Sequence, residues 1–191
     1  MTRGMRVRIF ILQGGLIGIL AFGSMLALGM GNFVQGTIHD QLSAQQIYFP
    51  AAGSKALPAS EFPELQQYGG QQVDNGIKAQ AYANGFIGRH LQSVAGGQTY
   101  AQVSAKAQAN PTDAKLQGQV ATLFKGETLI GMLLNTYGWW TVGTYAIYAG
   151  VGLAIAAGAV LMALLFEIFL VVKATDDAKA TVRATRVAHQ A

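Results

Sequence analysis

The stretch "YAIYAGVGLAIAAGAVLMALLFEIFLVV", residues 145–172, contains a single charged side chain, Glu167, among apolar and small residues. A helix of this length reaches about 40 Å, which exceeds the roughly 30 Å hydrocarbon core of a bilayer. We therefore predict a transmembrane helix over residues 144–172, either tilted or with its first turn among the lipid headgroups.

A second apolar run lies near the start of the chain. Residues 9–30, "IFILQGGLIGILAFGSMLALGM", carry no charge, and Gln13 and Ser24 are their polar side chains. The sequence thus predicts a first transmembrane helix over residues 9–33. A secretory signal peptide is the alternative, but the run is longer than a usual signal core and no cleavage motif is evident before Gln35, which favours an uncleaved helix.

The composition agrees with a membrane protein. Only 12% of the 191 residues are charged, against roughly 25% in an average soluble domain. The chain has no cysteine, so we expect neither disulfides nor thiol chemistry.

The basic residues predict the orientation of the two helices. Three arginines lie in residues 1–8, and the tail 173–191 begins with Lys173, whereas residues 31–144 hold six basic and six acidic side chains. By the positive-inside rule, both termini are cytoplasmic and the protein lies in the cytoplasmic (inner) membrane.

The connection, residues 34–143, is predicted to be a helical extracytoplasmic domain. We expect the first helix to continue to Pro50, a helix from Asn75 or Asp74 to the Gly96-Gly97 pair, and a capping box of Thr99 with Gln102. A last helix opens at Pro111 with an apolar stripe and runs into the second span; the stripe comprises Leu116, Val120, Phe124 and Leu134. The predicted fold class is an all-α membrane protein, with two transmembrane helices and this domain inserted between them.

Both tryptophans of the chain stand at the outer end of the second span. Indole and phenol rings favour the interface between bilayer and water, so we interpret this group as a membrane-interface anchor. A ring platform for a quinone or lipid headgroup is the alternative. The residues are Tyr137, Trp139, Trp140, Tyr145 and Tyr148.

Small residues recur every fourth position along both spans. They form one track in the second span, and a shorter one in the first, of the kind that lets helix backbones approach closely in lipid. Such tracks predict helix packing, either between the two spans or with another subunit or another copy of the chain. The residues are Gly14, Gly18, Ala146, Gly150, Ala154 and Gly158.

Glu167 is the intramembrane ionisable residue of the second span. A charge in hydrocarbon costs at least a few kcal/mol, so such residues are candidates for function. Pairing with a headgroup or with Arg6 or Arg8 is one interpretation, and a proton-relay or ion-site role is the other.

Motifs for catalysis are absent from the sequence. His39 and His90 with Asp40 or Asp74 match no standard metal-ligand spacing, and there is no phosphate-binding loop, no dinucleotide fingerprint and no nucleophile elbow. We expect no enzyme activity, no metal, no cofactor and no nucleic-acid partner.

Two stretches resemble a family of small two-helix membrane proteins of actinobacteria: "FPELQQYGGQQVDNGIKAQAYANGFIGRHL" (residues 62–91) and "GGQTYAQVSAKAQANPTDAKLQGQVATLFKGETLIGMLLNTYGWWTVG" (residues 96–143). Some members carry the automatic label of aromatic ring-opening dioxygenase, which implies a non-haem iron site that this sequence does not match. The resemblance implies a cell-envelope context, in which small accessory subunits accompany respiratory complexes.

Together these features predict a non-catalytic accessory, scaffold or assembly subunit of a larger membrane complex. Its expected partners are the lipid bilayer and other membrane subunits or copies of itself. The alternative is a self-assembling homo-oligomer that forms a pore or transport element.

Overall fold

A computed structural model describes residues 3–188. These residues form helices and loops, with no strand among them, only one isolated antiparallel bridge between Tyr48 and Gln72. The predicted all-α class is therefore confirmed. The chain divides into two compact units: a two-helix unit (residues 1–29 and 146–191) and a central unit (residues 30–145).

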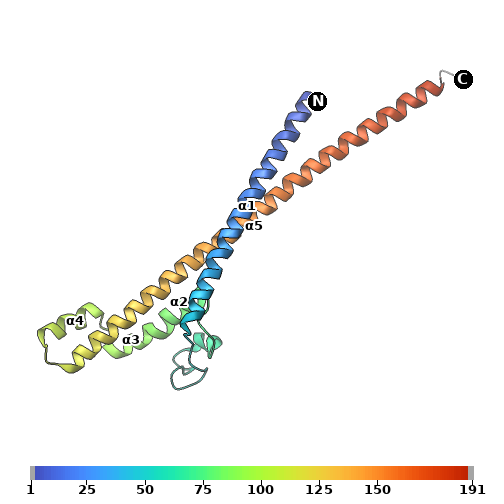
Figure 1. Cartoon of the computed structure of the whole chain (residues 1–191). Helices are drawn as coiled ribbons and strands as arrows, with labels where there is room; N and C mark the ends of the chain where they lie inside the picture. Colours follow the sequence, from blue (N-terminus) through green and yellow to red (C-terminus); the bar gives the residue numbers. More distant parts are fainter. Residues whose placement is uncertain (1–2, 189–191) are drawn as a thin grey trace. The chain divides into compact units, whose positions relative to one another are not determined.

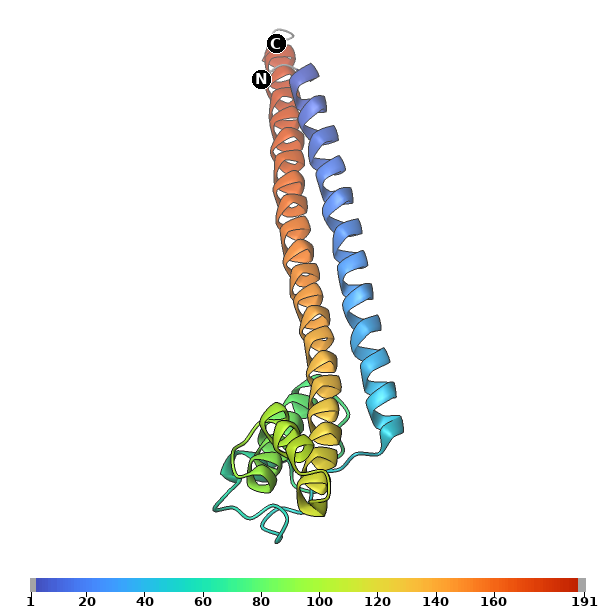
Figure 2. The same ribbon diagram turned by 90° about the vertical axis from the view of Figure 1, so that its left-hand side faces the viewer.

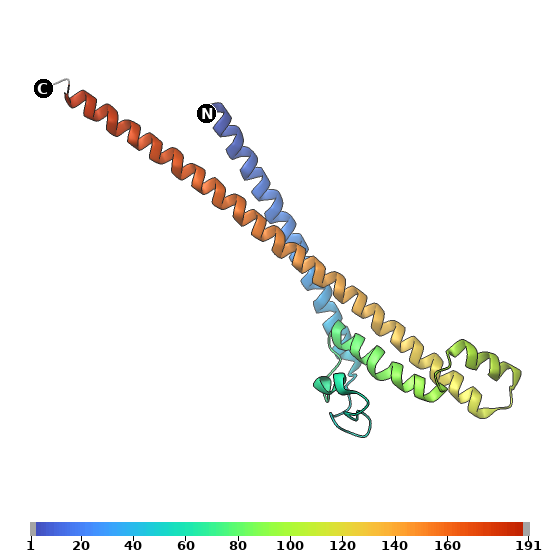
Figure 3. The same ribbon diagram turned by 180° about the vertical axis from the view of Figure 1, so that it is seen from behind.

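The two-helix unit consists of the first part of α1 (Arg3–Gln45) and the last part of α5 (Ala114–Ala188), whose ribbons run alongside one another in Figure 2 and diverge toward the chain ends in Figures 1 and 3. Both helices are long and apolar enough to cross a membrane. Only 6% of the most apolar window of each is buried, whereas the core helix of a soluble protein buries most of such a window. Their apolar side chains therefore face away from the rest of the chain, as they do in helices that contact lipid.

The contact between these two helices follows a seven-residue repeat. The less exposed positions of α1 alternate in steps of three and four, and those of α5 do the same. This spacing is the pattern of left-handed helix pairs, because it averages 3.5 residues per turn. The positions are Gln13, Ile17, Leu20, Ser24 and Ala27 on α1, and Gly150, Leu153, Ala157, Val160, Leu164 and Glu167 on α5.

The central unit begins with the last part of α1. This helix ends at Gln45, where Gln46 adopts a positive φ of 52°, so it stops before Pro50, where the sequence predicted its end. A loop then leads to the 3₁₀ helix η1 (Pro63–Tyr68). Figure 1 labels the elements in chain order.

The predicted helix after Asn75 forms in three consecutive parts. They are α2 (Gly76–Gln80), the π-helical segment η2 (Ala81–Ile87) and α3 (Gly88–Ala95). The Asn75 side chain accepts from the Lys78 N–H, and Gly96 closes α3 with a left-handed φ of 59°. Both predicted ends are confirmed, while the π segment has no counterpart in the sequence prediction.

The next helix, α4 (Tyr100–Ala109), begins with the predicted capping box. The Thr99 side chain accepts from the Gln102 N–H, and the Gln102 side chain accepts from the Thr99 N–H. Two otherwise unpaired helix-end donors are satisfied in this way.

The start of α5 differs from the prediction. Pro111 lies in a turn, and the helix begins at Ala114 because Asp113 Oδ1 accepts from the backbone N–H of Lys115 and Leu116. The predicted apolar stripe was also wrong at one position. Phe124 is 58% exposed and its ring lies tilted against that of Tyr100, while the neighbouring Leu123 is buried.

The core of the central unit lies between α2, η2, α3, α5 and the end of α1. Figure 3 shows α3 beside the first part of α5, where Leu91 fills the space next to Gly126 and Gln119 donates to the Val94 carbonyl. Aromatic rings join the loops to η2: Phe49 stacks on Tyr68 at 5.3 Å and meets Tyr82 edge-on at 5.0 Å, and Phe62 contacts Phe86.

Candidate functional site

Gly150 lies in close contact with α1 in the two-helix unit. A Cβ added there would lie 2.7 Å from Leu28 Cγ and 2.9 Å from the Leu28 backbone nitrogen. The buried Ser24 hydroxyl donates to the Gly150 carbonyl at 2.7 Å. The absence of a side chain at Gly150 and a hydroxyl on α1 thus fix the two backbones at this level.

The remaining small residues of the predicted tracks are not covered in this way. Ala146 is half-buried, but Ala154 and Gly158 are exposed, as are Gly14 and Gly18 of α1. A spacing of four advances about 40° per step around a helix of 3.6 residues per turn, so the track leaves the internal contact beyond Gly150. Ala154 and Gly158 therefore form an exposed small-residue face on α5, and Gly14 and Gly18 form a second exposed pair on α1.

Glu167 has a partner on α1 that the sequence prediction did not name. Gln13 Nε2 donates to Glu167 Oε1 at 3.3 Å. Glu167 also borders a groove of about 380 Å³ that Arg6, Ile9 and Phe10 line from α1. Among the residues that the structure describes, Glu167 forms no ion pair.

Ser24 and Gln13 are thus the two functional candidates that the sequence reasoning missed. Each is a polar residue within an otherwise apolar run. A lone polar residue in such a run is the sequence signal that could have identified them. A polar side chain in a lipid-facing helix is expected to find a partner on a neighbouring helix.

The aromatic group around Trp139 divides by environment. Trp140 packs on Gly76, where an added Cβ would overlap the Trp140 side chain, so this indole belongs to the core of the central unit. Trp139, Tyr145 and Tyr148 are more than half exposed, and Tyr137 is half-buried. The exposed rings suit an interfacial role, and the interface anchor stays a prediction.

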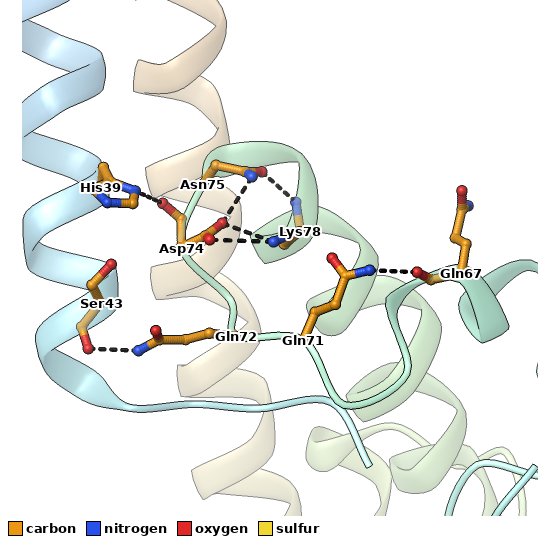
Figure 4. A network of polar contacts seen from close by, with 8 residues as sticks. All are labelled: His39, Ser43, Gln67, Gln71, Gln72, Asp74, Asn75 and Lys78. Carbon is orange, nitrogen blue, oxygen red and sulfur yellow. Dashed lines mark hydrogen bonds and ion pairs between the residues drawn. The ribbon is translucent and has the colours of Figure 1, made fainter. Parts of the chain in front are cut away.

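His39 belongs to a polar network that ties α1 to the start of α2 (Figure 4). His39 Nδ1 lies 3.0 Å from the Asp74 carbonyl oxygen, and the Asp74 carboxylate pairs with Lys78 at 3.1 Å. Gln72 donates to the Ser43 carbonyl at 2.7 Å. These contacts are structural, because they use the side chains to hold a loop against a helix.

An open groove of about 900 Å³ lies in the central unit, with Lys55, Glu61, Phe62 and His90 on its walls. Arg89 also lines it, but its guanidinium already contacts the Glu64 carboxylate, the Glu61 carbonyl and the face of Phe62.

In the same central unit, burial raises the pKa of the Tyr82 phenol above its ordinary value.

The described residues contain no group of three or more His, Cys, Asp or Glu side chains placed to hold a metal ion. Comparisons with family models, with curated proteins and with solved structures find no match to this chain. A functional interpretation therefore depends on three structural features: two apolar helices, an exposed small-residue face, and a Gln–Glu pair within the apolar helices.

Proposed function

We propose that this chain is a non-catalytic membrane protein that docks onto larger membrane subunits as an accessory, scaffold or assembly component. The single observation that carries the proposal is the small-residue face at Ala154 and Gly158, which stays exposed after α1 and α5 have packed on one another. In lipid, a glycine or alanine face gains van der Waals contact when another helix approaches it closely.

The membrane placement in this proposal rests on apolar length and on charge. Each of α1 and α5 contains a stretch long and apolar enough to span, and the described residues bury only 6% of the apolar window in each. Arginines before the first span and lysines after the second favour cytoplasmic termini, which would place the central unit outside the cytoplasmic membrane.

The test is affinity purification of the full-length chain from its native membrane in a mild detergent, followed by native mass spectrometry. We expect other membrane subunits in stoichiometric amounts with the wild-type chain. Gly158→Leu should lower their recovery about tenfold or more, because a lost helix contact of ~1.4 kcal/mol changes an equilibrium constant by a factor of ten.

Gly152→Leu is the matched control, because Gly152 is also exposed on α5, has open space around it and lies off the track. It should recover the same partners as the wild type. A monomeric wild-type chain that brings down nothing would end the proposal. Equal recovery with Gly158→Leu would move the docking site away from this face.

A second candidate is a self-assembling homo-oligomer that forms a pore or transport element. Gly14 and Gly18 favour this candidate, because they give α1 an open glycine face of its own. A neighbouring copy of α5 can pack closely against such a face. The same mass spectrum distinguishes the two candidates: one species with several copies of this chain and no other subunit would favour the oligomer.

A further inference from the structure

The contact between Gln13 and Glu167 is incomplete on one side. Gln13 Nε2 donates to Glu167 Oε1, but Gln13 Oε1 is buried and has no hydrogen-bond partner among the residues that the structure describes. A buried acceptor without a donor is destabilising, and such groups are uncommon in native structures. The pair therefore needs one more donor.

A carboxylate cannot supply that donor. Ionised Glu167 has only acceptor oxygens, so exchanging the positions of the Gln13 oxygen and nitrogen would place two acceptors against each other. A protonated carboxyl has one acceptor and one O–H donor, the complement of a primary amide. With the proton present, Oε1 of Glu167 accepts from Gln13 Nε2 while the O–H of Glu167 donates to Gln13 Oε1, and both side chains are satisfied.

We propose that Gln13 and Glu167 form a proton-binding site between α1 and α5, in which Glu167 is held as the neutral acid by a cyclic pair of hydrogen bonds with the Gln13 amide. This inference rests on the membrane insertion proposed above, since the cost of a carboxylate among apolar side chains favours the neutral form. It does not depend on any partner subunit.

The groove that Glu167 borders is also lined by Arg6, the group that stabilises the ionised state. Arg6 lies on the same face of α1 as Gln13, seven residues or about 10 Å before Gln13 along the helix. Arg8 is on the exposed side of α1, and Lys173 lies beyond the apolar run on α5 itself. When Glu167 releases its proton to solvent, the carboxylate exchanges the Gln13 amide for the Arg6 guanidinium, which makes the site a proton-linked switch between two partners.

The test uses the purified full-length chain in phosphatidylcholine vesicles with dicyclohexylcarbodiimide, an apolar reagent that modifies protonated carboxyl groups. Peptide mass spectrometry should find the adduct on Glu167 at near-neutral pH. Infrared spectra should show a neutral-carboxyl carbonyl band that is missing in Glu167→Gln. Carbodiimide labelling requires the reagent to reach Glu167, whereas the infrared band requires only that the carboxyl is neutral. The infrared measurement therefore checks the labelling result independently.

Two variants separate a proton site from a purely structural contact. Gln13→Leu removes the groups that hold the neutral acid, and should lower the pH of half-maximal labelling by about half to one pH unit. Arg6→Gln removes the cation that favours the carboxylate, and should raise that pH by a similar amount, about half to one unit. Arg8→Gln is the matched control and should leave the pH unchanged.

The proposal is overturned if the wild type shows neither the adduct nor the infrared band from acidic to near-neutral pH. It is also overturned if Gln13→Leu and Arg6→Gln fail to shift the labelling pH in opposite directions. Because the vesicles contain only this chain, these results are independent of whether native membranes yield a partner complex.

Discussion

Gly76 shows how one residue positions a tryptophan. It is buried at the first position of α2, directly against the Trp140 side chain of α5. Because any Cβ there would overlap the indole, Gly76→Ala should lower the free energy of unfolding of the chain by about 1–3 kcal/mol, the usual cost of overpacking. Denaturant unfolding in detergent, followed by tryptophan fluorescence, measures this.

The control for that variant is Gly118→Ala, since Gly118 is an exposed helical glycine with open space around it. Alanine there should leave stability unchanged or raise it by about 0.5–1 kcal/mol. Equal losses for both variants would show that the Trp140 contact is not the cause.

Tyr82 gives a prediction of pH dependence at the same scale. Burial raises the pKa of this phenol, so the unfolded chain loses the proton first as pH rises through about 10. Stability is therefore full below that pH and falls between the unfolded and the folded pKa. Tyr82→Phe, which keeps the ring contacts with Phe49 and Phe86, should reduce this alkaline loss; an unchanged slope of stability against pH would contradict the assignment.

At the scale of elements, Gly150 sets the distance between α1 and α5. Gly150→Val should push the helices apart, because the added carbons would contact the Leu28 backbone, and should destabilise the pair by about 1–3 kcal/mol. The chain has no cysteine, so spin labels on Ile19→Cys and Ile155→Cys, both exposed, report the helix distance directly. Electron paramagnetic resonance should give a longer or broader distribution of distances between the two labels in Gly150→Val than in the wild-type sequence at position 150.

Gly158→Val is the control for this measurement, because no described residue outside the adjacent turns of α5 lies within 4 Å of a Cβ at that position. The distance between the labels should stay that of the wild type. A shift with Gly158→Val as large as with Gly150→Val would mean that the seven-residue contact stripe is misplaced.

The elements that depend on local chemistry could be predicted from the sequence. The Thr99–Gln102 capping box, the Asn75 cap and the Gly96 terminator need only neighbouring residues, and span length follows from bilayer thickness. The pairing of Gln13 with Glu167 joins residues 154 positions apart, and it depends on the register of two helices. A single sequence contains no signal for that register, and the four-residue glycine pattern pointed to a face that turns away from the contact.

At the scale of the whole molecule, the proposed topology requires the central unit and the C-terminal tail to lie on opposite sides of the membrane. Single cysteines at exposed positions, Ser60→Cys in the central unit and Lys179→Cys after the second span, can be placed in a chain that has no other thiol. In intact cells, a membrane-impermeant maleimide should label Ser60→Cys and leave Lys179→Cys unlabelled until the membrane is permeabilised. The reverse pattern would invert the orientation inferred from the basic residues. Labelling of both in intact cells would exclude a spanning second helix, because its single crossing separates position 60 from position 179.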